Sequence, residues 1–185
     1  MKDIDADRAK LLELIRRDAF KLGEFTLASG AKSNYYIDGR LLTLSSDGAH
    51  VLARVILAMI EGEEIDAVGG MTMGADPIIG AVLAVADANG RRLNGFLCRK
   101  QKKDHGTGRQ IEGNLDAGDK VLMVEDVVTT GGSTLRAIDA VEELGGEVVR
   151  VIAMVDRLAG AADAFAERGY DFTPIFTVRD LGIEP

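Results

Sequence analysis

The sequence has few cysteines, few aromatic side chains and no long apolar stretch. Its 185 residues include one cysteine, three prolines and no tryptophan, and 5% are aromatic. A single cysteine excludes an intramolecular disulfide, and we expect Cys98, which ends the apolar segment GFLC, to be a buried thiol rather than a nucleophile. No apolar stretch approaches the roughly 18 residues of a membrane span. Since the start, MKDIDADRAK, also lacks the apolar core of a secretory signal, we expect a cytoplasmic protein that contacts no membrane.

Positive charge is also scarce. The chain has 22 lysines and arginines against 30 aspartates and glutamates, for a formal net charge of -8. Nucleic acids and anionic lipids bind surfaces that are rich in lysine and arginine, so the composition argues against either partner. Any cationic binding site must therefore be confined to a short segment of the chain.

Short apolar runs alternate with helix-like segments along most of the chain. This alternation is typical of an α/β fold, and 185 residues are enough for one compact domain. We expect a five-stranded, mainly parallel sheet flanked by helices. Its strands are IDAVGG at 65–70, GFLC at 95–98, KVLMVE at 120–125, EVVRVIAMV at 147–155 and PIFTV at 174–178.

The N-terminal part departs from this alternation. Residues 6–22 carry apolar side chains at helical spacing as far as Leu22, and YYID at 35–38 is typical of a strand. We therefore expect a single domain, residues 1–185, in which residues 1–40 contribute to a small hood.

Capping residues mark the ends of the later helices. Ser46 is placed to cap a helix that carries apolar residues at helical spacing, and Asp76 followed by Pro77 is a favourable start for the next one. The helix that follows TTGGST can end at Gly145 or Gly146.

The carboxyl ends of the expected strands carry unusual chemistry. In a parallel sheet these ends share one edge, where ligands bind, so the loops after Gly69, Cys98, Glu125 and Val155 should meet there. The loop TTGGST at 129–134 offers backbone N–H groups, hydroxyls and two glycines that could enclose a phosphate as a helix begins. Neither GxxxxGK[ST] nor GxGxxG is present, which argues against a nucleotide kinase or a dehydrogenase.

Two carboxylates, Glu125 and Asp126, precede this loop and are separated from it by two valines. They would repel a phosphate, but carboxylates accept hydrogen bonds from sugar hydroxyls and stabilise nearby positive charge. A ribose 5-phosphate would satisfy both the acidic pair and the loop. On physical grounds alone, an acidic helix cap followed by a flexible turn is an equally good interpretation.

Most of the local positive charge lies in RKQKKDHGTGR at 99–109. Its glycines suggest a mobile lid that could close over a polyanion, although such a loop is often only a solvated surface. The cations, grouped around His105, are Arg99, Lys100, Lys102, Lys103 and Arg109.

Four segments together resemble a known family. VLMVEDVVTTGGST at 121–134 closely resembles the signature with which type I phosphoribosyltransferases bind phosphoribosyl pyrophosphate (PRPP), and RKxxKDHG at 99–106 resembles the catalytic loop of orotate phosphoribosyltransferases. FTLASGAKSNYYIDGR at 25–40 is similar to that family's N-terminal region, and MVDR at 154–157 to the strand end whose arginine meets the orotate carboxylate. The resemblance spans residues 25 to about 157.

The resemblance implies a fold, a reaction and a partner. The fold is the type I phosphoribosyltransferase fold, and the reaction is the reversible transfer of ribose 5-phosphate from PRPP to orotate in pyrimidine biosynthesis. It gives orotidine 5'-monophosphate (OMP) and pyrophosphate. The enzyme would be a homodimer in which the loop at 99–109 completes the site of the partner subunit. Mg²⁺ would be carried by PRPP with no direct protein ligand, and Glu125 or Asp126 could reach it through water.

The resemblance also implies roles for particular residues. Orotate would be bound by Thr129 and Arg157, and the segment GGMTMGADP at 69–77 would line the pyrophosphate side. The catalytic residues would be Lys103, His105, Glu125 and Asp126. The PRPP-binding residues would be Arg99, Lys100, Lys103, His105, Glu125, Asp126, Val127, Val128, Thr129, Thr130, Gly131, Gly132 and Ser133.

The sequence departs from some bacterial members at two positions. They have ligand-contacting lysines where Ala28 stands and near Gly74. Here Lys32, Arg99 and Lys103 could supply more of the positive charge that binds pyrophosphate and orotate. Tyr35 and Tyr36 alternate across the expected strand, so only one can face the site, and by family position Tyr36 is nearer the base.

Two rival functions stay open. A purine or uracil phosphoribosyltransferase would keep residues 121–134 but should lack the combination of SGxxSxYY with RKxxKDHG. A regulator with this fold that binds RNA would need a basic face, which the net charge of -8 disfavours.

Overall fold

A six-stranded sheet forms the centre of the computed structural model, which describes residues 4–26, 30, 32–100 and 110–184. The strand order is β5-β4-β3-β6-β7-β8. Five strands run parallel, as the sequence predicts, and the short β5 pairs antiparallel with β4 at the edge. The strands are β3 (Ala67–Met71), β4 (Asn94–Cys98), β5 (Ile111–Gly113), β6 (Lys120–Val128), β7 (Glu147–Asp156) and β8 (Phe172–Thr177).

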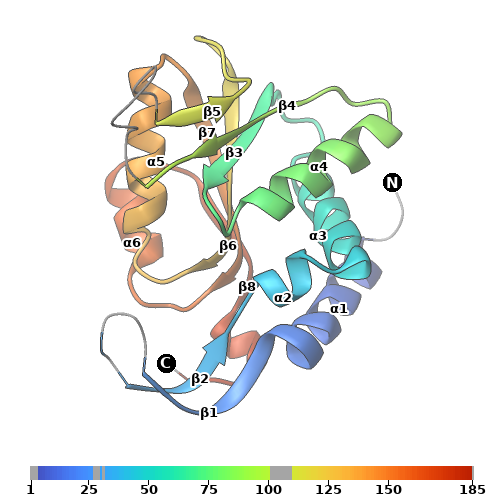
Figure 1. Ribbon diagram of the computed structural model, residues 1–185, viewed down its shortest axis with the longest axis vertical. Helices are drawn as coiled ribbons and strands as arrows, with labels where there is room; N and C mark the ends of the chain where they lie inside the picture. The colour runs from blue at the N-terminus through green and yellow to red at the C-terminus, as the bar shows by residue number, and fades with distance from the viewer. Residues whose placement is uncertain (1–3, 27–29, 31, 101–109, 185) are drawn as a thin grey trace.

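Helices cover both faces of this sheet (Figure 1). Side chains of β6 alternate between the faces: Leu122 and Val124 pack with α1, α3 and α4, and Val121 and Met123 pack with α5 and α6. Because both faces are covered, the strands carry apolar residues on both faces over most of their length, as expected. The helices are α1 (Ile4–Leu14), α3 (Ser46–Met59), α4 (Asp76–Ala88), α5 (Gly132–Glu143) and α6 (Ala161–Glu167), and a 3-10 turn, η2 (Val178–Leu181), follows β8.

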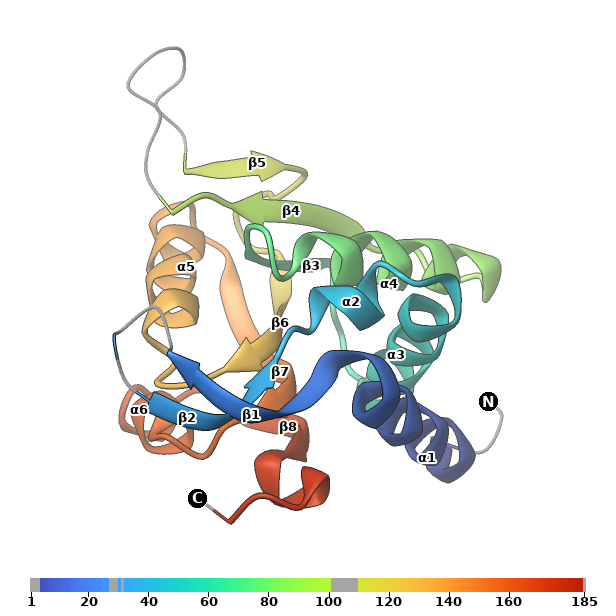
Figure 2. The ribbon, with the colours of Figure 1, turned by 60° about the horizontal axis from the view of Figure 1, so that its bottom comes forward.

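The N-terminal region forms a separate antiparallel hairpin. After α1 comes a π-helical turn, η1 (Ile15–Ala19), then β1 (Phe20–Thr26), β2 (Lys32–Ile37) and the short α2 (Arg40–Thr43). The expected helix to Leu22 is therefore too long. Leu22 lies in β1 opposite Tyr35 and its side chain is 70% exposed, because the apolar spacing continues by coincidence into a solvated strand. Figure 2 shows the hairpin apart from the central sheet.

The helix caps agree with the sequence in all but one case. Ser45, not Ser46, caps α3: its hydroxyl accepts from the N–H of Gly48 at 3.2 Å and donates to the carbonyl of Leu42 at 2.8 Å. The helix begins one residue earlier than expected, and Ser46 is its first residue. Pro77 stands in the first turn of α4 as predicted.

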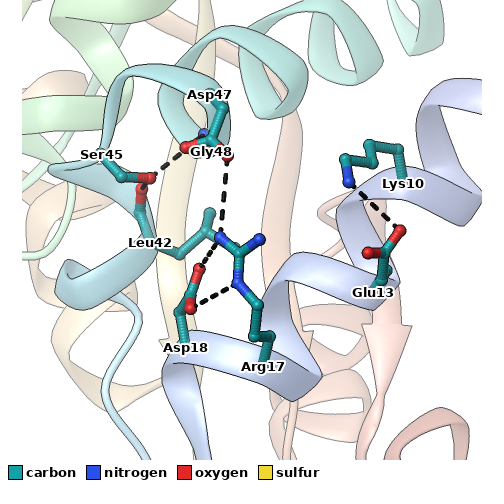
Figure 3. A network of polar contacts seen from close by, with 8 residues as sticks. All are labelled: Lys10, Glu13, Arg17, Asp18, Leu42, Ser45, Asp47 and Gly48. Atoms are coloured by element: carbon teal, nitrogen blue, oxygen red, sulfur yellow. Dashed lines mark hydrogen bonds and ion pairs between the residues drawn. The ribbon is translucent and has the colours of Figure 1, made fainter.

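A polar network joins the N-terminal segment to the start of α3 (Figure 3). The guanidinium of Arg17 lies 2.6 Å from a carboxylate oxygen of Asp18 and 3.7 Å from one of Asp47. Asp47 also accepts a hydrogen bond from the N–H of Gly48, so the arginine links η1 to the first turn of α3. No helix among the described residues is long and apolar enough to cross a membrane.

Candidate active site

The carboxyl ends of β3, β4, β6 and β7 share one edge of the sheet, as predicted. Backbone hydrogen bonds tie neighbouring loops together there. The N–H of Thr72, after β3, donates to the carbonyl of Cys98 at 2.9 Å, and that of Arg157, after β7, donates to Val128 at 3.0 Å. The segments singled out in the sequence are therefore neighbours in space.

The acidic pair belongs to a strand rather than to a loop. Strand β6 continues to Val128, three residues beyond the expected end at Glu125, because Val127 and Val128 pair with β7. Val128 is buried, and Val127 donates its N–H to the carboxylate of Asp126 at 2.8 Å. Both valines lie directly before the proposed phosphate loop.

Glu125 is a buried carboxyl group that is hydrogen-bonded to the start of α5. Its side chain is 8% exposed, and its Oε2 accepts a hydrogen bond from the hydroxyl of Thr134 at 3.1 Å. Burial, and next the charge of Asp126, raise the pKa of Glu125, and the Thr134 hydrogen bond opposes this increase. A carboxylate held in this way would favour a positively charged ligand atom beside it.

Two glycines lie directly against the acidic pair. A Cβ at Gly39 would stand 2.8 Å from Oδ2 of Asp126, and one at Gly74 would stand 2.5 Å from its Oδ1 and 2.9 Å from Oε1 of Glu125. Any side chain at Gly74 would require the acidic pair to move. The backbone of these two loops thus fixes the space available to Asp126.

The loop at 129–134 joins β6 to the first turn of α5. Thr129 and Thr130 are exposed, and Gly132 and Ser133 are partly buried. The first N–H groups of a helix have no partner within it, so the start of α5 can bind an anion. This arrangement fits the predicted phosphate-binding role, which stays a prediction.

The two glycines of this loop have different constraints. Gly131 has φ of +77°, and a Cβ there would lie 3.1 Å from the Phe165 ring. A Cβ at Gly132 would meet no atom closer than 3.8 Å. Gly131 is therefore required by the fold itself, and Gly132 is the position where a side chain would first affect a ligand.

Arg157 follows β7 and packs on the N-terminal hairpin. Its guanidinium lies over the ring of Tyr35 at 4.7 Å from the centroid, and its Nε donates to the Tyr35 hydroxyl at 3.1 Å. Its Nη2 lies 3.5 Å from Oγ of Ser33. The predicted alternation is present, since Tyr35 is 9% exposed and Tyr36, 38% exposed, packs against Phe25. The placement of Tyr36 near the base stays a prediction.

A cavity of about 690 Å³ opens between this hairpin, Arg157 and the C-terminal segment. Lys32 lines it and donates from Nζ to Oγ1 of Thr26 at 2.9 Å. Lys32 is thus tied to the hairpin and does not lie beside the acidic pair. The other lining residues are Glu24, Phe25, Ser33, Asn34, Tyr35, Ile183 and Glu184.

The basic segment is described only at its start. Arg99 follows β4, and its Nε lies 3.2 Å from a carboxylate oxygen of Glu112 in β5. Lys100 is exposed. The structure does not bring these two residues to the acidic pair, which lies two strands away in the sheet order. Lys103 and His105, with Lys102, Arg109 and Ala28, lie outside the described residues.

Some residues of the site escaped sequence reasoning. Thr134 belongs to the loop at 129–134 and Gly39 to the segment at 25–40, both singled out in the sequence, but the contacts of Thr134 with Glu125 and of Gly39 with Asp126 were not predicted. Asp156, 2% exposed, accepts from the N–H of Leu158 at 2.9 Å, and burial raises its pKa. Cys98 is fully buried, as expected, and burial raises the pKa of its thiol to about 12.

Known proteins share this arrangement along nearly the whole chain. The family profile described as "Phosphoribosyl transferase domain" matches residues 44–168. The orotate phosphoribosyltransferase of Rhodopirellula baltica is 46% identical over 97% of this chain and 96% of its own length, and that of Nostoc sp. is 42% identical over 97% and 87%. The chain belongs to the orotate phosphoribosyltransferase family.

Solved structures support the same membership. The orotate phosphoribosyltransferase of Mycobacterium tuberculosis, in its complex with Fe(III) dicitrate, is 41% identical, covers 96% of this chain and 99% of its own, and has a TM-score of 0.85. Its complex with PRPP has a TM-score of 0.81 at 38% identity, with 96% and 99% coverage. An adenine phosphoribosyltransferase from Leishmania donovani is 12% identical to this chain, with a TM-score of 0.66, and shares only its fold.

Proposed function

We propose that this chain transfers ribose 5-phosphate reversibly from PRPP to N1 of orotate, giving OMP and pyrophosphate, in pyrimidine nucleotide biosynthesis. The observation that carries the proposal is the hydrogen bond from Thr134 to the buried Glu125, which joins an acidic pair to a helix start suited to phosphate. Family membership supports the same substrates, since the named relatives are orotate phosphoribosyltransferases and one is solved with PRPP.

The two parts of the site would divide the work on the sugar phosphate. The 5'-phosphate would accept hydrogen bonds from backbone N–H groups and hydroxyls of residues 129–134. The ribose hydroxyls would donate to Glu125 and Asp126, which have no N–H or O–H of their own when ionised. Binding both ends holds C1' in one place and supplies much of the orientation that the transfer requires.

The acidic pair would also act on the charge that develops during transfer. As the bond from C1' to pyrophosphate breaks, the sugar gains oxocarbenium character, and a fixed carboxylate nearby stabilises it. Glu125 is held for this role by Thr134, and Asp126 by the N–H of Val127. The backbone of Gly39 and Gly74 limits the positions that Asp126 can take.

Orotate differs from uracil by a carboxylate, which calls for a cation. Arg157 is suited to this role because Tyr35 and Ser33 orient its guanidinium while leaving further N–H donors for a ligand. Thr129 would lie beneath the pyrimidine ring. An unpaired buried guanidinium would make a site occupied by uracil much less favourable.

Mg²⁺ fits the donor set of this site. Burial, and next the charge of Asp126, raise the pKa of Glu125 when no cation is near. The described residues contain no group of three or more histidine, cysteine or acidic side chains that could hold a metal alone. When bound, Mg²⁺ would be held by PRPP oxygens and by waters that reach Glu125 or Asp126, and it would neutralise the leaving pyrophosphate.

Further cations would come from the segment at 99–109. Lys103 and His105 would bind the departing pyrophosphate, and Arg99 and Lys100 would contribute at the base of the loop. In a homodimer this loop would extend over the partner's acidic pair and exclude water that could hydrolyse PRPP. Residues 1–40 would serve as a hood beside the base, within one domain of residues 1–185.

An absorbance assay tests the function directly. The purified chain is incubated with PRPP and Mg²⁺ and with orotate, uracil, hypoxanthine or adenine in parallel. We expect rapid PRPP-dependent loss of orotate and little reaction with the other three bases. Faster use of a purine base or of uracil would assign the chain to a different phosphoribosyltransferase activity.

A further inference from the structure

Arg40 is an exposed arginine that begins α2 and has no role in the site described above. Its side chain is 45% exposed. The carboxylate of Asp38 accepts two hydrogen bonds from this side chain: Arg40 Nε donates to Oδ1 at 2.8 Å and Nη2 donates to Oδ2 at 3.0 Å. The same Oδ1 also accepts from the Arg40 N–H at 3.2 Å. A surface arginine held by one carboxylate in this two-pronged way has a fixed direction, unlike most exposed arginines.

The neighbours of Arg40 place it at the acidic pair. Gly39, the preceding residue, lies so close to Asp126 that a Cβ would stand 2.8 Å from its carboxylate. Gly74, in the loop that follows β3, touches the same carboxylate from another direction. The side-chain hydrogen bond to Asp38, then the charge of Asp38, and more weakly the charges of Tyr36 and Asp126, raise the pKa of Arg40. Arg40 therefore stands where the hairpin, the loop after β3 and the acidic pair meet.

Arg40 retains unused hydrogen-bonding capacity. A guanidinium has five N–H donors, and Asp38 accepts from two of them. Within the part of the chain that the structure describes, Asp38 is its only ion-pair partner. Since a Cβ at Gly39 would lie against Asp126, these donors belong to a side chain that starts one residue from the acidic pair, where an anionic ligand needs added positive charge.

We propose that Arg40 binds the pyrophosphate group of PRPP, with Asp38 as the residue that positions it. The inference rests on the proposed function. A side chain at Gly74 would meet the carboxylates of Asp126 and Glu125, so the loop after β3 cannot supply a cation from that position. Arg40, one residue beyond Gly39, supplies one beside the acidic pair. An arginine can bind two oxygens of a phosphate at once, which a lysine cannot.

Calorimetry with three ligands separates this role from a structural one. In the presence of Mg²⁺, the dissociation constants of pyrophosphate, PRPP and OMP are measured for the wild type and for Arg40→Gln. We expect the variant to bind pyrophosphate and PRPP about tenfold to a hundredfold more weakly, because a charge-assisted hydrogen bond is lost. OMP lacks the pyrophosphate group, so its affinity should change less than about twofold, within the variation of a surface substitution.

Arg168→Gln is the matched control. Arg168 is 38% exposed, lies 2.6 Å from one carboxylate oxygen of Asp139, and caps the C-terminal end of α6. It should leave all three affinities unchanged. Asp38→Asn keeps the cation but weakens its orientation, so it should impair pyrophosphate binding less than Arg40→Gln does, with OMP again spared.

Three outcomes would be informative. If Arg40→Gln binds pyrophosphate and PRPP as tightly as the wild type, Arg40 does not bind that group. If Arg40→Gln lowers the affinity for OMP by the same factor as the affinity for PRPP, Arg40 acts only by supporting the loop beside Asp126, and the proposal is wrong. If the wild type binds neither PRPP nor OMP, the proposed function fails instead, and thermal melting of each variant verifies that the protein is folded.

Discussion

The hydroxyl of Thr134 donates to the buried carboxyl group of Glu125 across the loop that joins β6 to α5, at 3.1 Å. This contact couples the part of the site suited to a phosphate with the part suited to a ribose. It also holds Glu125 in a position that is unfavourable for an isolated charge, since burial and the neighbouring Asp126 raise the pKa of Glu125. Removing the charge of Glu125 should therefore stabilise the folded protein and weaken substrate binding.

Glu125→Gln should stabilise the empty protein and weaken substrate binding. Because the folded-state pKa of Glu125 is raised, the folded state binds more protons, and wild-type stability falls as pH rises from the unfolded pKa through the folded one. The gain from glutamine should be small at acidic pH and reach about 1–3 kcal/mol of unfolding free energy above neutral pH. Denaturant unfolding at several pH values measures it, and calorimetry with OMP measures the loss of affinity.

Glu142→Gln is the control for this experiment. Glu142 is an exposed acid on α5 that accepts from the Tyr170 hydroxyl at 2.7 Å, and glutamine can still accept that bond. The unfolding free energy of Glu142→Gln, relative to wild type, should show no comparable increase as pH rises. A Glu125→Gln protein that loses stability at alkaline pH would contradict the assigned cause of the raised pKa.

The two glycines of the phosphate loop should separate folding from binding. Gly131→Ala places a side chain at φ of +77° and beside Phe165, so it should lower the unfolding free energy by about 1–2 kcal/mol. Gly132→Ala makes only ordinary van der Waals contacts and should not destabilise the protein, yet it should weaken binding of PRPP and OMP. Melting curves and calorimetry test both. Wild-type affinity in Gly132→Ala would mean that the 5'-phosphate lies elsewhere.

The sheet and its functional edge could be predicted because buried parallel strands are apolar along their whole length. The end of β6 was placed too early, since Glu125 and Asp126 interrupt the apolar run while pairing with β7 carries the strand on to Val128. Strand β5 has three residues, too few for any periodicity to appear.

The residues that complete the site were harder to predict. Gly39 and Gly74 touch Asp126, and Tyr35 touches Arg157, yet each pair joins segments far apart in the chain. No local pattern contains such a contact, so only the fold reveals it. The resemblance implies roles for Arg157 and the acidic pair but does not show which side chains orient them.

Gly74→Ala should lower activity with little effect on stability. Its new Cβ would lie 2.5 Å from Oδ1 of Asp126, so the carboxylate must move from the position in which it would face the ribose. We expect kcat/KM for PRPP to fall by roughly tenfold or more, as for a misplaced catalytic group. Gly80→Ala, on the exposed side of α4 with no atom within 4 Å, is the control and should keep full activity. Equal kinetics for the two variants would show that Asp126 can shift at no cost.

Two inactive variants should complement each other if the loop at 99–109 serves the partner subunit. Lys103→Ala and Asp126→Ala should each lower turnover by roughly 10² or more, because each removes a charge-assisted contact. After mild dissociation and mixing, a heterodimer would contain one site with both defects and one with neither. Activity should return in proportion to the heterodimer measured by mass spectrometry. No recovery despite verified exchange would place the loop over its own subunit.

The reverse reaction compares the two products that differ only by the orotate carboxylate, OMP and UMP. With Mg²⁺ and pyrophosphate, the wild type should convert OMP to orotate and PRPP at least about 10³-fold faster than it converts UMP to uracil, since UMP leaves Arg157 unpaired. Arg157→Gln should remove most of this preference by slowing the reaction of OMP. Comparable wild-type rates with OMP and UMP would contradict the central claim that this site is built for orotate.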